Sequence, residues 1–284
     1  MPYSVKIIAD SQTPDGDRIT TFELEYPRII HSELLTHRVF SKNSASSRAI
    51  PNFKMRDWVL NNMFIPFYWG SKRKGMQAGK PIKNEKFARL TWIVTAYCAM
   101  GLSWVLDKLK VHKQLSNRIL EPFSYIKIVL TGTDFNNLFH LRCHKDAAPE
   151  IQKIIRMMAR AYRDNTPRQV QYREWHLPYI LDEERDTYPI QCLLQYSAAR
   201  CARVSYQTFD GKPANPDDDE KTFDKLINGE RVHASPCEHQ AMKRDRDYFS
   251  SNNFMTWFQY RQYLKGNVCN KFDFDSLTDE DFVL

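Results

Sequence analysis

The sequence lacks several features that would place it in a common class. It holds no run of about eighteen uncharged apolar residues, and residues 1–6 carry no apolar signal segment, so we expect a soluble, cytosolic protein without a membrane partner. Its six cysteines form no Cys-x-x-Cys pair, which argues against a disulfide framework. Its eight histidines show no metal-ligand spacing, so we predict no metal site.

The charge of the chain is also one-sided, with a formal net charge of +7 and a pI near 9.0. Such a balance suits anionic ligands. No zinc-finger, RNA-recognition or basic-zipper pattern is present, so we expect a small phosphorylated ligand rather than a nucleic-acid duplex. A nucleic-acid-binding protein stays as an alternative, because aromatic residues lie near basic ones.

Hydrophobic periodicity predicts an α+β fold with a mixed or antiparallel sheet flanked by helices, in a single domain over 1–284. Strands are predicted at 5–9, 19–26 and 125–130, the first two joined by a turn at 14–16. Helices are predicted at 29–39, 84–110, 114–122, 134–142, 149–164, 193–204 and 255–264. The helix at 84–110 has one apolar face, made of Leu90, Ile93, Val94, Tyr97, Cys98 and Gly101. Residues 208–221 read as a flexible acidic loop, and 273–281 as a loosely held acidic tail.

The densest group of polar donors lies at residues 37–48. These twelve residues include two arginines, one histidine, four serines and one asparagine. Arginine offers a fixed fork of donors suited to phosphate, and small hydroxyls with backbone N–H groups let an anion approach closely. The segment therefore predicts an anion-binding loop, although a solvated polar loop after a helix has a similar composition.

Four further clusters carry polar side chains among apolar neighbours. They are Arg118 within 117–122, Asn137 and Arg142 within 131–142, Arg203 within 199–206, and His239 within 235–239. Each has an ordinary structural interpretation. Arg118 and Arg142 can lie on helix surfaces with packed stems, and His239 can simply follow the start of a helix.

Together, these five segments resemble the flavin-dependent thymidylate synthases. The family signature is Arg-His-Arg-x-x-Ser-x-Asn-Glu-x-Ser-x-Arg-Tyr, and the matching residues here are His37, Arg38, Ser41, Asn43, Ser46 and Arg48. Asn137, Leu141, Arg142 and Glu150 are similar to the family's Asn-Phe-x-x-Leu-Arg…Glu-Ile stretch. Residues 202–206 and 235–239 resemble its Ala-Arg-Val-Ser-Tyr and Ser/Thr-Pro-Phe-Glu-His elements. In shorter members these last two elements come first, so the chain resembles the longer, permuted forms common among phages, which act in the host cytoplasm.

The resemblance implies an FAD-dependent homotetramer with active sites shared between subunits. Such enzymes methylate C5 of dUMP to give dTMP, using methylenetetrahydrofolate and NADPH. By resemblance, the catalytic Arg142 stabilises the pyrimidine when N3 loses its proton. The nucleotide phosphate and sugar would be held by Arg118, Ser44, Ala45, Ser46, Ser47 and Arg48. FAD would be held by His37, Arg38, Asn137 and His239.

Several positions depart from the family pattern. Thr36 replaces the first arginine of the signature, Ser44 its glutamate and Ala49 its tyrosine, while Thr131 and Thr133 replace an asparagine and an arginine that bind FAD in shorter members. These departures keep a related reaction open: hydroxymethylation of dUMP or methylation of dCMP on the same scaffold. The basic loop at 71–79 is a candidate cover for folate or NADPH. Cys237 is interpreted as a packing residue rather than a nucleophile.

Overall fold

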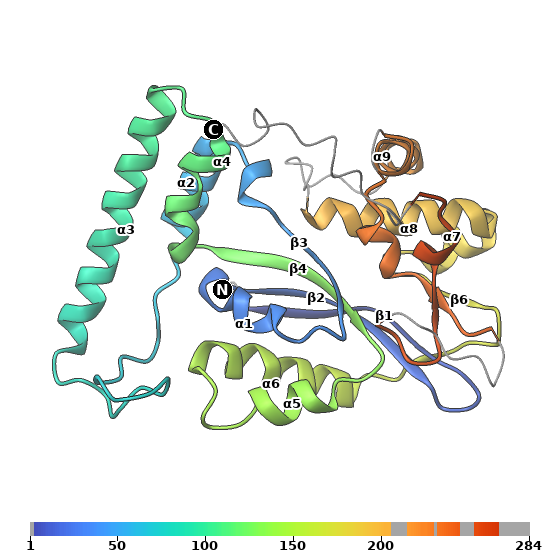
Figure 1. The fold of residues 1–284 in the computed structure, drawn as a ribbon, viewed down its shortest axis with the longest axis horizontal. Coiled ribbons are helices and arrows are strands. Elements are labelled where there is room, and N and C mark those ends of the chain that lie inside the picture. The colour runs from blue at the N-terminus through green and yellow to red at the C-terminus, as the bar shows by residue number, and fades with distance from the viewer. Residues whose placement is uncertain (1–2, 206–214, 230–231, 245–252, 267–284) are drawn as a thin grey trace, which may run out of the picture.

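The computed structural model describes residues 3–205, 215–229, 232–244 and 253–266 (Figure 1). At its centre lies a five-stranded sheet with the order β3-β4-β2-β1-β5. Its strands are β1 Ser4–Gln12, β2 Arg18–Pro27, β3 Ser41–Ser44, β4 Tyr125–Gly132 and β5 Arg168–Gln169. All neighbours are antiparallel except β1 and β5, which are parallel. The predicted mixed sheet and its three predicted strands are therefore confirmed.

The predicted hairpin between the first two strands is present. The Thr13 amide donates to the Asp17 carbonyl at 3.0 Å, and the Gly16 amide donates to the Thr13 carbonyl at 2.9 Å. Gly16 has a φ of +87°, a conformation that glycine adopts without steric cost. The turn fixes the register in which β1 meets β2.

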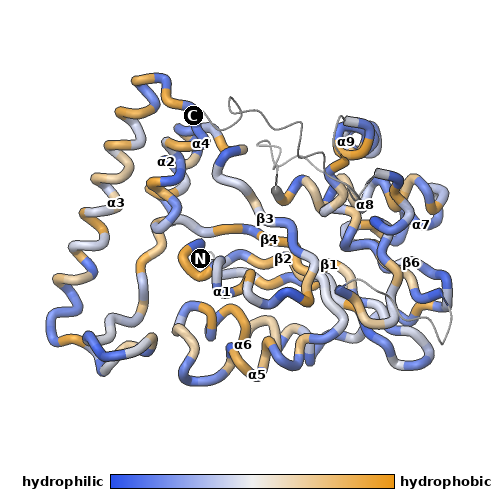
Figure 2. Tube along the Cα trace, in the orientation of Figure 1, coloured by the Kyte–Doolittle hydropathy of each residue, from blue (hydrophilic) through white to orange (hydrophobic). Residues whose placement is uncertain are grey.

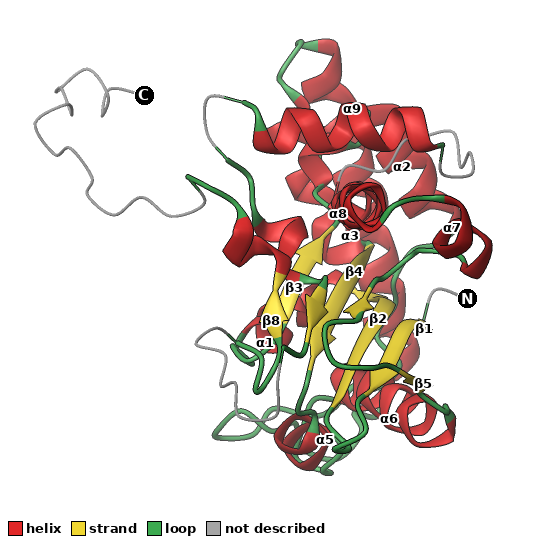
Figure 3. Ribbon diagram, turned by 90° about the vertical axis from the view of Figure 1, so that its right-hand side faces the viewer, coloured by secondary structure: helices red, strands yellow, loops and turns green. Residues whose placement is uncertain are grey.

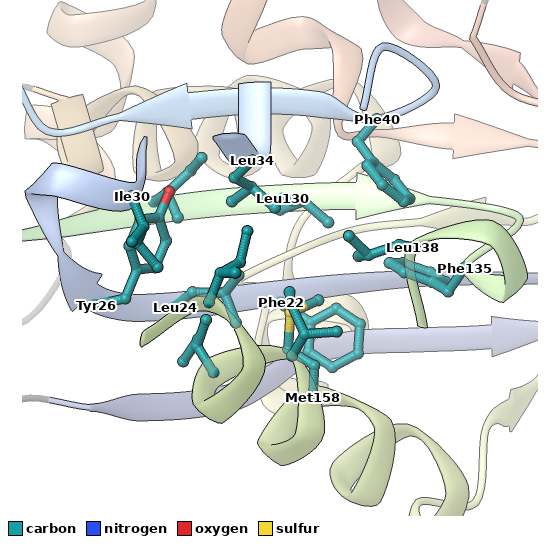
Figure 4. Packing of buried hydrophobic residues seen from close by; sticks show 14 of the residues in the cluster. Phe22, Leu24, Tyr26, Ile30, Leu34, Phe40, Leu130, Phe135, Leu138 and Met158 are labelled. Atoms are coloured by element: carbon teal, nitrogen blue, oxygen red, sulfur yellow. The ribbon is translucent and has the colours of Figure 1, made fainter. Parts of the chain in front are cut away.

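One face of the sheet is apolar and carries the main core. Residues Phe22, Leu24 and Tyr26 of β2 stand opposite Leu130, Ile128 and Ile126 of β4. They pack with residues of α1 (His31–Leu35), α5 (Asn136–Arg142) and α6 (Pro149–Asp164), as Figure 4 shows for part of this cluster. Helix α6 has the predicted bounds and buries Ile151, Ile154, Ile155 and Met158.

The opposite face is covered by the C-terminal part of the chain, here called the C-terminal layer (residues 175–264 where described). It comprises α7 (Asp182–Thr187), α8 (Ile190–Ser205), α9 (Pro216–Ile227) and a small sheet of β6 (Trp175–His176), β7 (Ala241–Met242) and β8 (Phe258–Gln259). Figure 3 shows the sheet between α5 and α6 on one side and α8 and α9 on the other. The 3₁₀ turns η4 (Ser235–Glu238) and η5 (Tyr260–Tyr263) complete this layer.

A helical arm stands beside the sheet (Figures 1 and 2). It contains η2 (Ser47–Ala49), α2 (Asn52–Asn61), α3 (Glu85–Lys108), α4 (Lys113–Ser116) and η3 (Arg118–Phe123). The predicted apolar face of α3 is not its buried one: Leu90, Val94 and Tyr97 are each more than half exposed, whereas the smaller Ala96 and Ser103 pack inward with Met100. Among the described residues, α3 is also the one helix whose length and composition would allow a membrane span, which is weak support for one.

Several predicted elements differ in the structure. The helix expected at 29–39 is η1 (Arg28–Ile30) followed by the short α1, because Lys42 Nζ binds the Leu35 and His37 carbonyls and Thr36 Oγ1 binds the Glu33 carbonyl at the helix end. The piece at 114–122 is split into α4 and η3. The helix expected at 255–264 is β8 with η5, since Thr256 has a φ of +64° and residues 257–260 are all buried.

The acidic loop expected at 208–221 is wrong over its second half, where α9 begins. The Asn215 side chain caps the helix by accepting from the Asp217 amide, Pro216 occupies the first turn, and the three aspartates at 217–219 suit the positive helix end. Positions 208–214 and the predicted tail at 273–281 lie outside the described residues.

The core makes a direct prediction about stability. Phe22 is fully buried and meets Phe135 edge to face at 5.4 Å, so Phe22→Ala should lower the free energy of unfolding by about 3–5 kcal/mol. Urea titration at a fixed protein concentration measures the change. Phe53, 55% exposed on α2, is the control, and Phe53→Ala should change stability by no more than about 0.5 kcal/mol. Equal losses in the two variants would contradict this assignment of the core.

Candidate functional site

The segment at 37–48 is a strand with a turn at each end, rather than the predicted loop. Ser41 to Ser44 pair with Thr131 to Ile128 of β4, and the Ala45 amide donates to the Lys127 carbonyl at 2.8 Å. This pairing engages backbone groups that we expected to face an anion. It also places His37 before one end of β3 and Ser47 beyond the other, so the predicted site residues fall into two groups.

The first group is centred on Arg142, the last residue of α5. Its Nε donates to His37 Nε2 at 3.0 Å, and its Nη2 donates to Thr36 Oγ1 at 3.3 Å. Because His37 Nε2 accepts this bond, the imidazole is neutral. Its pKa is lowered by burial first, and then by the charges of Arg142 and Lys42. The Arg142 guanidinium stays charged, with its side chain about one quarter exposed and Glu33 3.9 Å away.

The second group surrounds η2 and η3. Ser47 Oγ donates to Glu121 at 2.6 Å, Arg28 meets the same carboxylate at 3.1 Å, and the Asn117 amide nitrogen donates to the Ser47 carbonyl at 2.9 Å. These bonds join the two turns, so the structure does bring Arg118 into the neighbourhood of the serine segment.

The cations of this second group differ in how exposed they are. Arg48 and Arg118 are exposed, and the Ser46 hydroxyl accepts from the Arg48 amide at 3.3 Å. Arg118 Nε donates to the Gln114 carbonyl at 3.1 Å. The pKa of Arg28 is lowered by burial, which Glu121 opposes and the charge of Arg118 reinforces. Two guanidiniums are thus presented outward beside a partly buried Arg–Glu pair.

A cavity of about 330 Å³ adjoins this second group. Its lining combines the cations Arg28, Lys54 and Lys127 with the carboxylate of Glu25 and with apolar and aromatic side chains of Ala45, Ile50, Met55, Trp58 and Tyr125. Burial raises the pKa of the Glu25 carboxyl, an effect that the charge of Lys127 opposes. Cations beside an aromatic wall suit an anionic ligand with a flat ring.

The four residues predicted to hold FAD differ in their exposure. Arg38 and Asn137 are exposed, His37 is buried against Arg142, and His239 has no exposed surface. The Nδ1 of His239 is hydrogen bonded to Thr131 Oγ1 at 2.8 Å, so the structure does not support direct contact between His239 and a flavin. Arg38 and Asn137 carry suitable outward donors. Arg142 lines a cavity with His140, Leu141, His144, Asp146 and Ala147, to which neither Arg38 nor Asn137 contributes.

Two of the later family-like segments nevertheless lie against the segment at 37–48, here called the opening motif. Ser235 and Pro236 share the lining of a small hollow with Asn43 and Ser44, and α8 lies against β3 and β4. Cys237 is fully buried among residues of the C-terminal layer, and burial raises the pKa of its thiol to about 12. A thiol that stays protonated is a poor nucleophile, which supports the packing interpretation.

Arg203 has a structural partner in the same layer. Its Nη1 lies 2.8 Å from Asp219, a fully buried carboxylate that also binds Arg200 Nε at 2.8 Å. This ion-pair cluster fastens α9 to α8. The aspartate that sequence reasoning assigned to a flexible loop therefore holds the layer together.

Sequence reasoning missed the residues that connect these groups, namely Arg28, Glu121, Lys54, Trp58, Thr21 and His176. Glu121 lies in the segment 117–122 that the sequence singled out for Arg118, and the other five lie in none of the five segments. The alternation of β2 does signal that Thr21 faces opposite to Phe22, but its partners come from positions more than one hundred residues away. Only the folded chain brings them together.

Comparison with known proteins identifies the family of the chain. A family model described as Thymidylate synthase complementing protein matches residues 18–168. The chain belongs to this family. The match confirms the resemblance to flavin-dependent thymidylate synthases, and the family segment contains the opening motif, Arg118, Asn137 and Arg142. Arg203 and His239 lie beyond the segment matched to the thymidylate synthase complementing family, so the permuted motif order stays a prediction.

Solved structures with some similarity include two of a UMP/dUMP methylase, PolB from Streptomyces cacaoi. The one bound with 5-Br UMP is 15% identical, with a TM-score of 0.42 over 56% of this chain and 88% of that chain. The one bound with 5-Br dUMP is 15% identical, with a TM-score of 0.44 over 56% and 89%. No curated protein matches the sequence significantly.

The buried histidines predict that acid destabilises the protein. Burial lowers the pKa of His176 and of His239 to about 3, below the unfolded value of about 6.5. Below about pH 6.5 the unfolded chain therefore binds more protons, and each histidine should remove about 1.4 kcal/mol of unfolding free energy per pH unit. Urea titrations between about pH 7 and about pH 5 measure this slope.

Two variants separate this effect from general acid sensitivity. His176→Gln should reduce the slope by one proton equivalent, whatever its effect on stability at neutral pH. Phe22→Ala, which destabilises the protein without removing a titratable group, should leave the slope unchanged. The same slope in all three proteins would rule out the buried neutral state of His176.

Proposed function

We propose that the protein is a flavin-dependent thymidylate synthase that methylates C5 of dUMP to give dTMP, with methylenetetrahydrofolate and NADPH as co-substrates. Family membership supports this class of chemistry. The observation that carries the proposal is the contact between Arg142 and neutral His37. It fixes a permanently charged guanidinium beside a group that adds no positive charge of its own.

The proposed role of Arg142 follows from that electrostatic setting. Loss of the N3 proton makes the pyrimidine ring anionic and C5 more nucleophilic, and a held guanidinium stabilises the ring as its charge develops. His37 and Thr36 orient the guanidinium through Nε and Nη2, which reduces its freedom before substrate binds. His37 is thus a positioning residue for this step.

The nucleotide phosphate is proposed to bind at the other end of β3. Arg48 and Arg118 present exposed guanidiniums there, together with Ser44, Ala45, Ser46 and Ser47, and the neighbouring cavity adds a cationic, aromatic wall. Because β3 separates this group from Arg142, we propose that the two groups meet across subunits of a homotetramer with shared active sites. That arrangement accounts for two half-sites in one chain.

FAD is proposed to bind between subunits, with Arg38 and Asn137 as ligands. When bound, the flavin supplies the redox chemistry of the reductive methylation. His239 is not included among these ligands, because it is fully enclosed in the protomer. Visible absorption of the purified protein tests cofactor binding directly: a flavin spectrum supports the proposal, and a colourless protein that takes up no added FAD contradicts it.

A second reaction on the same scaffold is hydroxymethylation of dUMP or methylation of dCMP. The observation that favours it is Thr36, which occupies the place of a family arginine and accepts a hydrogen bond from Arg142. A charged donor is thereby missing from the nucleotide side. Incubation with methylenetetrahydrofolate, NADPH and either dUMP or dCMP, followed by mass analysis of the product, distinguishes the three outcomes.

Arg142 supplies the sharpest test of the proposed site. Arg142→Ala should reduce turnover by about 10²–10³-fold and weaken dUMP binding, because a charged donor to the developing anion is lost. Calorimetry measures the dissociation constant, and product formation measures turnover. Arg163→Ala is the matched control, since Arg163 is an exposed helix arginine paired with neighbouring Asp164. Wild-type affinity for dUMP in the Arg142 variant would refute the assigned role.

A further inference from the structure

The face of the sheet opposite the main core carries a row of buried hydroxyls. Thr131 of β4 stands directly opposite Thr21 of β2 on one side and Ser41 of β3 on the other, so the three side chains share one face. All are buried beneath the C-terminal layer. Burying hydroxyls is costly unless each is hydrogen bonded, and apolar residues would fill the same space without that requirement.

Two histidines of the C-terminal layer join Thr21 and Thr131 of this row to Ser11 of β1 in a continuous chain, here called the histidine–threonine chain. Four hydrogen bonds join its five side chains: Ser11 Oγ with His176 Nδ1 at 2.9 Å, His176 Nε2 with Thr21 Oγ1 at 2.8 Å, Thr21 Oγ1 with Thr131 Oγ1 at 2.7 Å, and Thr131 Oγ1 with His239 Nδ1 at 2.8 Å. The chain crosses β1, β2 and β4 without interruption.

Every member of the chain can both donate and accept a proton. When both imidazoles are neutral, the five groups carry five mobile protons for four hydrogen bonds, so one proton is left over. If the surplus proton is on His239, it sits on Nε2. In every hydrogen bond the group nearer Ser11 is then the donor and the group nearer His239 is the acceptor. If the surplus proton is on Ser11, donor and acceptor are exchanged in every hydrogen bond, and Nε2 of His239 carries no proton. The two arrangements differ only in proton positions.

The two ends of the chain differ from its middle. Ser11 is 4% exposed, whereas the other four members have no exposed surface. At the opposite end, His239 Nε2 has no hydrogen-bond partner among the described residues. His239 directly follows Glu238, whose carbonyl accepts from the Gln259 side chain that also binds Ser41 Oγ at 3.0 Å. The residue that precedes His239 is therefore linked through Gln259 to the first residue of β3.

We propose that the histidine–threonine chain is a buried proton relay between His239 and Ser11. A proton that arrives at bare Nε2 of His239 releases the Nδ1 proton to Thr131. Each hydroxyl or ring then passes its own proton one bond onward, and the Ser11 hydroxyl proton leaves to water. One proton enters, one leaves, and no heavy atom has to move.

If the proposed function holds, the relay would carry away a proton that the reaction releases. Substitution at C5 of the pyrimidine releases one proton, and Glu238, the neighbour of His239 in the chain, is linked through Gln259 to Ser41 of the opening motif. Thr131 and Thr21 would then be positioning residues, because they act on the reaction only through His239. The relay itself can be tested without any substrate, so its failure and that of the proposed enzyme activity are distinguishable.

Exchange of the His239 ring N–H with D₂O measures proton passage along the chain. NMR of protein with isotope-labelled histidine follows this exchange. Removing a link by Thr21→Val should slow it by about tenfold or more if the proton travels along the chain, whereas exchange through transient opening should become faster in a destabilised variant. The two mechanisms therefore predict changes of opposite sign.

Two control variants complete the experiment. Thr20→Val removes a neighbouring, equally buried hydroxyl that donates to Asp10 at 2.8 Å and lies outside the chain, so it should not slow exchange. Thr21→Ser keeps the hydroxyl and should restore the wild-type rate. Exchange in Thr21→Val that equals or exceeds that in Thr20→Val would overturn the relay.

Discussion

The pairing of β4 with β2 on one side and β3 on the other is the constraint on which the rest of the structure depends. It gives the sheet two faces of different chemistry: Leu130 and Ile128 face the aromatic core, while Thr131 faces the C-terminal layer. It also fixes which side chains of β3 lie on each face, so that Ser41 lies in the row of buried hydroxyls, here called the polar row. A shift of register by one residue would exchange these faces, and both the core and the polar row would be lost.

Strand β3 also separates two electrostatic environments. At its start, Arg142 contacts a histidine kept neutral, so one permanent charge dominates. Beyond its end, Glu121 neutralises Arg28 while Arg48 and Arg118 remain exposed. The second environment suits a phosphate, whose charge is already present, and the first suits a ring that becomes anionic during reaction. This division of labour is the physical reason for proposing a site completed by a second copy.

Much of the fold was predictable because its signals are local. The alternation of Phe22, Leu24 and Tyr26 and the helical spacing of Ile151, Ile155 and Met158 each identify one element and its buried face. Strand β3 was missed because a strand of polar residues has no hydrophobic period, and α9 because its acidic first turn was interpreted by composition rather than as a capped helix start. The links from Thr21 to His176 and from Thr131 to His239 were beyond reach, since each joins residues over one hundred positions apart.

Thr131 is both a departure from the family pattern and a member of the row of buried hydroxyls on the sheet. By resemblance, this position departs from an asparagine that binds FAD in shorter members, and the structure gives the threonine two other partners, Thr21 and His239. A hydroxyl that bridges two buried groups is not available to a cofactor, and displacing His239 would break one of the two side-chain hydrogen bonds of Thr131. The hydrogen bond between Thr131 and His239 therefore ties the departure at position 131 to the enclosed histidine. Arg38 and Asn137, by contrast, are exposed on the surface.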